Sequence, residues 1–321
     1  MKICRFVDAK GTVRIGLVRQ TFPAVSSGGV SAAEAAAAEE TFPASVPEGG
    51  WVAFNSGTTI TDLTVAGINR LSSLLESKDP VAALSGVELD GLPRFRLEQV
   101  RLCPPVESQE VWAAGVTYLR SKTARMEESN FSATAYDRVY TAERPELFFK
   151  SLGEKVAGPG EPVGIRRDAR WSVPEPELAL VLNSRVEVSG YTIGNDMSSR
   201  DIEGENLLYL PQAKIYRHSC ALGPWIVVGP TEAEVRTWTI GLSIERDGNY
   251  VFQGEIRLGQ IKRRFEELRQ FLFRSQDFPH GAVLLTGTGI VPPETFTLQE
   301  RDVVEIRLSG IGVLRNAVSA M

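Results

Sequence analysis

The sequence predicts a β-rich α+β protein, in which a mixed β-sandwich or roll carries a smaller amino-terminal domain. Three observations support this class. From residue 106 onward, most segments resemble short strands separated by Gly and Pro turns. Helical patterns are few and do not alternate regularly with the strands, which argues against a doubly wound parallel sheet. The composition changes near Pro104 and Pro105, so we expect residues 1–105 to form a variable amino-terminal domain and residues 106–321 the larger one.

The amino-terminal part begins with a predicted hairpin, in which KICRFVD and TVRIGLV flank a short AKG turn. A further strand is expected at WVAFN, near Trp51. Residues 24–50 are rich in Ala, Ser, Gly and Glu and contain few large apolar groups, so we expect a flexible surface excursion there. The pattern INRLSSLLES predicts a helix before the boundary.

The larger part contains a succession of expected strands. They are VWAAGVTY (111–118), ELFFK (146–150), ELALVL (177–182), PWIVVG (224–229), the hairpin 237–256, AVLLTG (282–287) and VVEIRL (303–308). The dipeptide Asp247-Gly248 is a strong turn signal within that hairpin. The clearest helix is 259–276, where core residues are expected at helical spacing: Ile261, Phe265, Leu268, Phe271 and Leu272.

Composition and charge limit the class of partner. The 321 residues are 43% hydrophobic and 23% charged, and 35 basic against 40 acidic residues give a net charge of -5. This balance does not attract nucleic acid or an anionic membrane. No run of about 18 apolar residues is present, and the first residues become charged before a signal-like core could form, so we expect a cytoplasmic protein. Cys4, Cys103 and Cys220 lie too far apart to suggest disulfides or a zinc site.

Two glutamates begin an apolar strand in VPEPELALVLN. Glu175 and Glu177 are two residues apart, and in a strand such residues point to the same side. Two carboxylates held this close in an apolar space require either a proton or a cation. Pro176 lacks a backbone donor and indicates a strand start or a sheet edge. The alternative is a solvated pair of surface glutamates.

Two further segments carry candidate residues. In GYTIGNDMSSRD, Asp196 and Arg200 are four apart on an expected turn into a helix, where Arg200 could orient a metal-binding carboxylate. A helix cap with a surface ion pair is the alternative. Lys214 lies among apolar and aromatic residues in PQAKIYRHSCALGPW, which favours contact with a substrate anion or proton transfer. Its alternative is a lysine that extends from a surface strand to solvent.

Together, PEPELALVLN, GYTIGNDMSSRD, PQAKIYRHSCALGPW and GAVLLTGTG resemble, in order, the signatures of the fumarylacetoacetate hydrolase superfamily. The resemblance covers residues 106–321 and implies the mixed β-sandwich roll of that family. It implies that Glu175, Glu177 and Asp196 bind one divalent metal, with Arg200 in support. It also implies that Lys214 and Thr288 contact substrate, and we expect Lys214 and Glu175 to be catalytic.

The chemistry of these ligands agrees with the resemblance. Three carboxylates without Cys or His suit Mg²⁺, with Mn²⁺ or Ca²⁺ as alternatives, and suit zinc poorly. A dication there would leave positions for the keto and carboxylate oxygens of a 2-keto acid and would stabilise its enolate. We expect no organic cofactor.

The segments GVTYLRSKTARMEESN and YDRVYTAERPELFFKS resemble the sugar-acid dehydratase branch of the family, which contains 2-keto-3-deoxy-arabinonate dehydratase. This likeness implies dehydration of a 2-keto-3-deoxy-pentonate to 2,5-dioxopentanoate. Hydrolytic members commonly have a His after the Gly-x-x-Tyr motif, and here that position is Ser121. His218 could face the same cleft as Lys214, whereas His280 is expected to be structural.

In the dehydration hypothesis, Lys214 transfers a proton or stabilises the enolate, and Glu127, Glu128 or Glu146 supplies the other acid or base. Arg120, Lys150 and Tyr118 are expected to contact substrate, with surface charges as the alternative for the first two. Rival hypotheses are an acylpyruvate-type carbon-carbon hydrolase, a 2-keto acid decarboxylase, and a non-catalytic metal-binding domain. The resemblance also implies a homodimer.

Overall fold

The computed structural model describes residues 1–20, 57–119 and 138–321, and it confirms the β-rich class. The expected strand near Trp51 and the expected excursion at 24–50 lie outside these residues. Arg120, Ser121, Glu127 and Glu128 lie outside them too.

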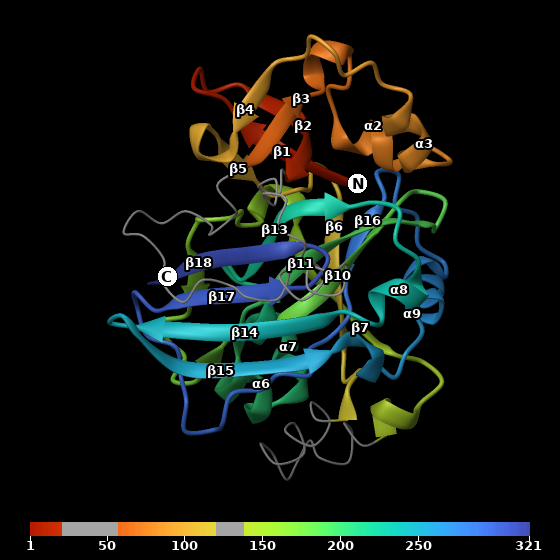
Figure 1. The fold of residues 1–321 in the computed structure, drawn as a ribbon. Coiled ribbons are helices and arrows are strands. Elements are labelled where there is room, and N and C mark those ends of the chain that lie inside the picture. Colours follow the sequence, from red (N-terminus) through yellow and green to blue (C-terminus); the bar gives the residue numbers. More distant parts are fainter. Residues whose placement is uncertain (21–56, 120–137) are drawn as a thin grey trace, which may run out of the picture.

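Within the described residues, the largest sheet has 11 strands in the order β4-β3-β2-β1-β13-β11-β10-β16-β6-β7, and β5 pairs with β1 (Figure 1). Its strands are β1 (Lys2–Val7), β2 (Val13–Gln20), β3 (Thr58–Asp62), β4 (Arg94–Arg96), β5 (Arg101–Cys103), β6 (Glu110–Gly115), β7 (Glu146–Leu152), β10 (Pro176–Leu182), β11 (Val188–Asp196), β13 (Cys220–Val227) and β16 (Ala282–Leu285). Neighbours are antiparallel except β16 and β6, which run parallel.

A five-stranded sheet of order β15-β14-β17-β18-β8 lies in front of β10 and β11 in Figure 1. Its strands are β8 (Val163–Ile165), β14 (Thr239–Arg246), β15 (Asn249–Arg257), β17 (Val303–Leu308) and β18 (Gly312–Ala320). A two-stranded ribbon joins β9 (Ser172–Val173) to β12 (Ser198–Ser199). The expected hairpin around Asp247-Gly248 is confirmed, because β14 pairs antiparallel with β15 across this turn.

The helices are short. They are α2 (Leu71–Leu75), α3 (Pro80–Ser85), α6 (Arg200–Glu205), α7 (Leu210–Lys214), α8 (Glu232–Val235) and α9 (Phe265–Phe273), with 3₁₀ turns η1 (Thr64–Ala66), η2 (Leu97–Gln99), η3 (Gly153–Lys155), η4 (Leu207–Tyr209) and η5 (Leu258–Gln260). None of the helices in the described ranges is long and apolar enough to cross a membrane.

The helix expected over 259–276 is shorter at both ends. At its start, η5 replaces the first turn and Arg264 is extended. At its end, the helix stops at Phe273 because Arg274 is extended. Four of the five expected core residues are buried, including Ile261, which precedes the helix. Phe271 is only partly buried and lies beneath the guanidinium groups of Arg144 and Arg274.

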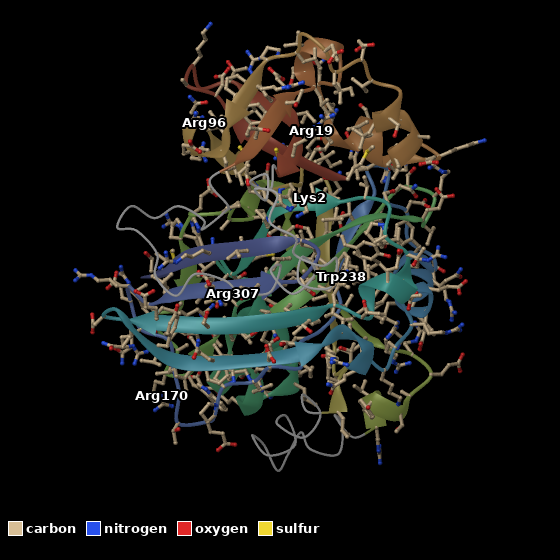
Figure 2. All side chains as sticks on the ribbon, in the orientation of Figure 1. Lys2, Arg19, Arg96, Arg170, Trp238 and Arg307 are labelled. Carbon is tan, nitrogen blue, oxygen red and sulfur yellow. The ribbon has the colours of Figure 1, made fainter. Side chains whose placement is uncertain are left out.

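The main core lies between the two large sheets. Leu178, Leu180 and Ile193 of the larger sheet share one buried cluster with Ile240 and Leu242 of the smaller sheet, and further members of the cluster complete the layer. Trp238, labelled in Figure 2, packs edge-on against Tyr191 of β11 at a centroid distance of 6.3 Å. This sheet-on-sheet packing is the expected β-sandwich roll.

Strand β10 is buried at every position, which explains its uninterrupted apolar sequence. Its even-numbered leucines face the main core, whereas Ala179 joins a second cluster with Val111, Val283 and Leu285. A strand covered on both faces has little freedom to move, so it provides a rigid support for the residues at its start.

The amino-terminal strands extend the large sheet, because β1 pairs with β13. Their own small core includes Ile3, Leu17, Leu71 and Leu75 and also contacts Ile226 of β13. The domain boundary near residue 105 stays a prediction. The three cysteines are buried and free, as expected.

Candidate active site

Three carboxylates meet where β10 begins and β11 ends. Glu175 directly precedes β10, Glu177 lies within it, and Asp196 is the last residue of β11. Because the two strands are antiparallel neighbours, the start of one adjoins the end of the other, and Asp196 N donates to Glu175 O at 3.0 Å. One oxygen from each carboxylate lies within 4.8 Å of the others. All three residues are at most 4% exposed, so the alternative of solvated surface glutamates is wrong.

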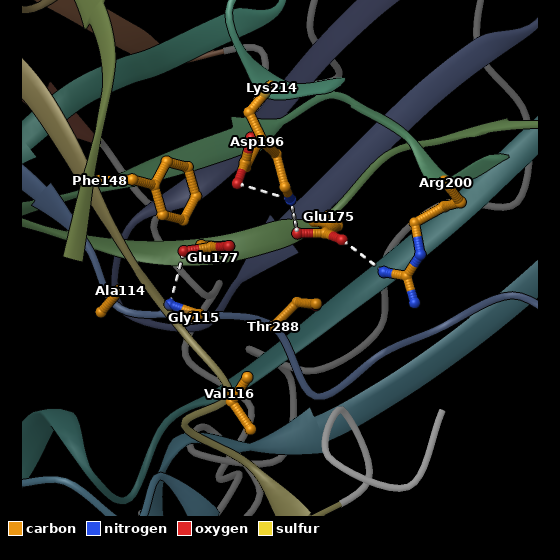
Figure 3. A pocket seen from close by; sticks show the side chains of 11 residues that line it. Ala114, Gly115, Val116, Phe148, Glu175, Glu177, Asp196, Arg200, Lys214 and Thr288 are labelled. Atoms are coloured by element: carbon orange, nitrogen blue, oxygen red, sulfur yellow. Dashed lines mark hydrogen bonds and ion pairs between the residues drawn. The ribbon is translucent and has the colours of Figure 1, made fainter. Parts of the chain in front are cut away.

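Lys214 joins two of these carboxylates. It ends α7, is fully buried, and its Nζ lies 2.6 Å from Glu175 Oε2 and 3.0 Å from Asp196 Oδ2 (Figure 3). A third bond, of 2.6 Å, runs to Ser198 Oγ. The alternative of a lysine extending to solvent is therefore wrong, and the ammonium neutralises part of the buried negative charge.

Arg200 contacts one of the three carboxylates, as a supporting residue would. Its Nη1 donates to Glu175 Oε1 at 2.7 Å. Arg200 begins α6, after β12. Arg200 is 1% exposed and is therefore not a surface ion pair.

Glu177 is held by a backbone amide. Gly287 N donates to Glu177 Oε2 at 2.5 Å. Burial raises the pKa of Glu177 well above its usual range, and the neighbouring Asp196 and Glu175 raise the pKa further. Gly287 has a φ of 87°, and a Cβ there would collide with Thr117 and approach Ala114 O, so the position requires glycine. The carboxyl group thus needs a proton or an added cation.

A small pocket lies beside these groups. It is lined by Ala114, Gly115, Val116, Phe148, Glu175, Glu177, Asp196, Arg200, Lys214, Gly287 and Thr288. Figure 3 shows Phe148 beside Glu177 and Asp196, with Thr288 and Val116 on the opposite side. Thr288 lines the pocket, and its contact with substrate stays a prediction. Phe148, Val116 and Gly287 were not expected. Gly287 belongs to the GAVLLTGTG motif, so its signal was present in the sequence.

Two residues expected to contact substrate do not line this pocket. Tyr118 is 2% exposed, a Cβ at Gly289 would press against its ring, and burial raises its pKa. Lys150 is 0% exposed, and its Nζ lies 2.5 Å from Asp196 Oδ1. Their contact with substrate stays a prediction.

The other candidate acids and bases are placed as follows. The Glu146 side chain lies against Gly115, which lines the pocket, and a Cβ at Gly115 would collide with its carboxylate. His218 is half-buried, and its Nδ1 lies 3.0 Å from Pro162 O. It does not line the pocket, although we expected that it could face the cleft. His280 is exposed in a turn. Among the residues that the structure describes, no histidine lines the pocket.

The donor set fits a hard divalent cation. Three buried carboxylates converge, and they supply only oxygen ligands. Burial, and then the neighbouring Asp196 and Glu175, raise the pKa of Glu177, and a bound cation would stabilise its ionised form. Mg²⁺, Mn²⁺ and Ca²⁺ all match this set, whereas zinc, which prefers nitrogen and sulfur ligands, does not.

Comparison with known proteins gives consistent results. The family model described as "Fumarylacetoacetate (FAA) hydrolase C-terminal" matches residues 110–319. A probable 2-keto-3-deoxyxylonate dehydratase of Haloferax volcanii is 46% identical over 217 residues, which are 68% of this chain and 74% of that protein. A 2-dehydro-3-deoxy-D-arabinonate dehydratase of Saccharolobus solfataricus is 38% identical over 262 residues, or 80% and 88% of the two chains.

A solved structure is similar over the whole chain. It is a 2-keto-3-deoxy-D-arabinonate dehydratase complexed with magnesium and 2,5-dioxopentanoate, 31% identical, with a TM-score of 0.74. The similarity covers 100% of this chain and 99% of the solved one.

Proposed function

The chain belongs to the fumarylacetoacetate hydrolase family, and from that premise we propose that it is a Mg²⁺-dependent lyase that dehydrates a 2-keto-3-deoxy-pentonate to 2,5-dioxopentanoate. One observation carries this proposal. The buried acidic trio shares its small pocket with the Lys214 ammonium, which brings a cation site and a proton carrier to one substrate. The two relatives named as dehydratases and the solved complex with magnesium and 2,5-dioxopentanoate support the reaction.

Glu175, Glu177 and Asp196 would hold the metal. When bound, Mg²⁺ supplies the positive charge that polarises the ketone and stabilises the enolate formed on loss of the C3 proton. Arg200 holds Glu175 Oε1, and the Gly287 amide holds Glu177 Oε2, so one oxygen of each glutamate is fixed by the protein. Fixed ligands lower the reorganisation needed when substrate binds.

Lys214 is our candidate for the proton transfer, with Glu175 beside it. Its Nζ has bonds to two carboxylates and to Ser198, so it can hold a proton near the pocket and pass it along this network. Thr288 places a hydroxyl at the pocket wall, and the Phe148 ring lies 5.7 Å from Lys214 Nζ and limits access of water. The substrate loses the C3 proton and the C4 hydroxyl as one water molecule. Tautomerisation then gives the aldehyde.

The described part of the site favours dehydration over hydrolysis. A carbon-carbon hydrolase needs a base that activates water, and no histidine lines the pocket among the described residues. The choice of pentonate stereoisomer, the roles of Arg120 and Glu146, the cytoplasmic location and the homodimer remain predictions.

The test is a substrate panel assayed with Mg²⁺. It contains the 2-keto-3-deoxy-pentonates that are epimeric at C4, together with fumarylpyruvate, acetylpyruvate and oxaloacetate. We expect a pentonate to give 2,5-dioxopentanoate, detected by mass spectrometry, with activity lost on chelation and restored by Mg²⁺. Release of two acids from an acylpyruvate, without turnover of any pentonate, would contradict the proposal in favour of a hydrolase.

A further inference from the structure

Lys150 of β7 is a buried cation outside the pocket wall. It is 0% exposed, and its Nζ lies 2.5 Å from Asp196 Oδ1. The same ammonium donates to Met197 O at 2.9 Å and to the carbonyl oxygen of Lys214. A lysine is rarely buried completely, because desolvation of its charge is costly. The contacts that offset this cost therefore indicate what the residue does.

A β-bulge places this side chain. In the pairing of β6 with β7, Trp112 faces Phe149 and Val111 faces Ser151, so Lys150 has no partner of its own in the register. Phe148 lines the pocket, whereas Phe149 turns away and packs edge-on against Trp112. A bulge inserts one residue, bends the strand and aims a side chain in a new direction. At this position Lys150 Nζ reaches Asp196, the last residue of β11.

From this position one ammonium reaches two functional elements. Lys150 pairs with Asp196 Oδ1, and the second oxygen, Oδ2, accepts a hydrogen bond from Lys214 Nζ. The carbonyl of Lys214 ends α7, where helix carbonyls lack partners within the helix, and a cation there also complements the helix dipole. The Tyr216 ring, 5.9 Å from Lys150 Nζ, packs near the same ammonium.

We propose that Lys150 is a positioning residue, which fixes the orientation of the Asp196 carboxylate and the backbone that carries Lys214. The inference rests on the proposed function, because it treats Asp196 as a metal ligand. It assigns Lys150 no contact with substrate. Its ammonium donates to two backbone carbonyls and forms an ion pair with Asp196, and neither a neutral side chain nor a planar guanidinium makes the same set of contacts.

A positioning role for Lys150 and a role in charge compensation alone predict opposite changes in Mg²⁺ affinity when Lys150 is removed. If Lys150 only neutralised Asp196, its removal would leave a more negative site, and Mg²⁺ would bind more tightly. If Lys150 orients the carboxylate, its removal misaligns a ligand, and loss of such support weakens metal binding by about 10–100-fold. The sign of the change in affinity therefore separates the two roles.

The experiment measures Mg²⁺ affinity by isothermal titration calorimetry for the wild-type protein, Lys150→Met and Lys150→Arg. Lys155→Met removes an exposed lysine from the turn after the same strand and serves as the control. We expect both Lys150 variants to bind Mg²⁺ more weakly, by about 10–100-fold for Lys150→Met, and to lose kcat because Lys214 moves with its backbone. The control should match the wild type.

Tighter Mg²⁺ binding by Lys150→Met, or wild-type affinity in Lys150→Arg, overturns the inference. If Lys150→Met does not fold, as judged by circular dichroism, Lys150→Arg still decides, because it keeps the charge and changes only the geometry. A wild-type protein that binds no Mg²⁺ contradicts the proposed function itself. If the wild type binds Mg²⁺ and dehydrates the pentonate while both Lys150 variants keep its Mg²⁺ affinity and kcat, that result contradicts only the positioning role of Lys150.

Discussion

Lys214 illustrates how a buried charge is tolerated at the scale of one residue. Desolvation of an ammonium costs several kcal/mol, roughly, and is offset only by close partners of opposite charge. Lys214 has two such partners within 3.0 Å, and both are proposed metal ligands. The partners lie 39 and 18 residues away in sequence. The sequence indicated the aromatic neighbourhood of Lys214 but not these contacts, since they depend on how β10, β11 and α7 meet.

Among the proposed ligands, Glu177 can be replaced by glutamine with the smallest expected change to its described hydrogen bonds. Its described hydrogen bond comes from Gly287 N, and a glutamine oxygen can accept the same bond. Glu177→Gln should therefore fold normally but bind Mg²⁺ at least about 100-fold more weakly, since it loses an anionic ligand in a buried site. Titration calorimetry measures the affinity, and the exposed Glu187→Gln is the matched control. Wild-type affinity in Glu177→Gln would remove this residue from the metal site.

At the scale of elements, the local sequence pattern predicted most strands, two hairpins and the shared side of Glu175 and Glu177. The alternation of side chains in a strand placed Glu175 and Glu177 together, because that relation depends only on backbone geometry. The Asp-Gly turn and the first hairpin were also predictable from local sequence. The sequence predicted that Arg200 supports a metal-binding carboxylate but did not identify Glu175 as that partner, because the two residues are 25 apart in sequence.

The bulge in β7 concerns Lys150, whose contact with substrate stays a prediction. An extra residue interrupts the pairing of β6 with β7 at this position, and Lys150 Nζ forms an ion pair with Asp196. Because bulges have no dependable sequence signal, this contact with a proposed metal ligand could not be predicted from the sequence.

The β1–β2 hairpin permits a test of pH dependence at this scale. Asp8 accepts hydrogen bonds from Lys10 N and Thr12 N and pairs with Arg14. The Thr12 amide, and then Arg14, lower the pKa of Asp8 below its usual value. A lowered folded-state pKa stabilises the protein above the unfolded pKa, and this stability is lost as the pH falls through the folded value.

We therefore expect Asp8→Asn to lower the melting temperature slightly at neutral pH and to match the wild type in strong acid, where Asp8 is protonated in both states. Melting curves from circular dichroism across acid pH measure this difference. Because a backbone amide is the main cause of the shift, much of the neutral-pH difference should persist in high salt. A difference that stays constant at every pH would show that the ionised carboxylate is not responsible.

At the scale of the whole molecule, the site exists only in the folded chain. Its lining extends from Ala114 to Thr288 and draws on β6, β7, β10, β11 and α7. The parallel pairing of β16 with β6 joins segments about 170 residues apart. The antiparallel pairing of β16 with β10 brings Gly287 to Glu177. These long-range strand pairings do not follow from local sequence. The resemblance to a family supplied it, because relatives that share a fold also share which strands become neighbours.

Because the ligands converge only on folding, Mg²⁺ should bind the folded state and stabilise it. At a concentration of about 100 times Kd, the expected stabilisation is about 2.7 kcal/mol, which corresponds to a rise of several degrees in melting temperature. Differential scanning fluorimetry with increasing Mg²⁺, followed by excess chelator, measures the rise and its reversal. Glu177→Gln is the control and should show little response. An equal rise in that variant would mean that Mg²⁺ acts elsewhere on the protein, because the same ion would then stabilise a chain whose proposed site has lost a ligand.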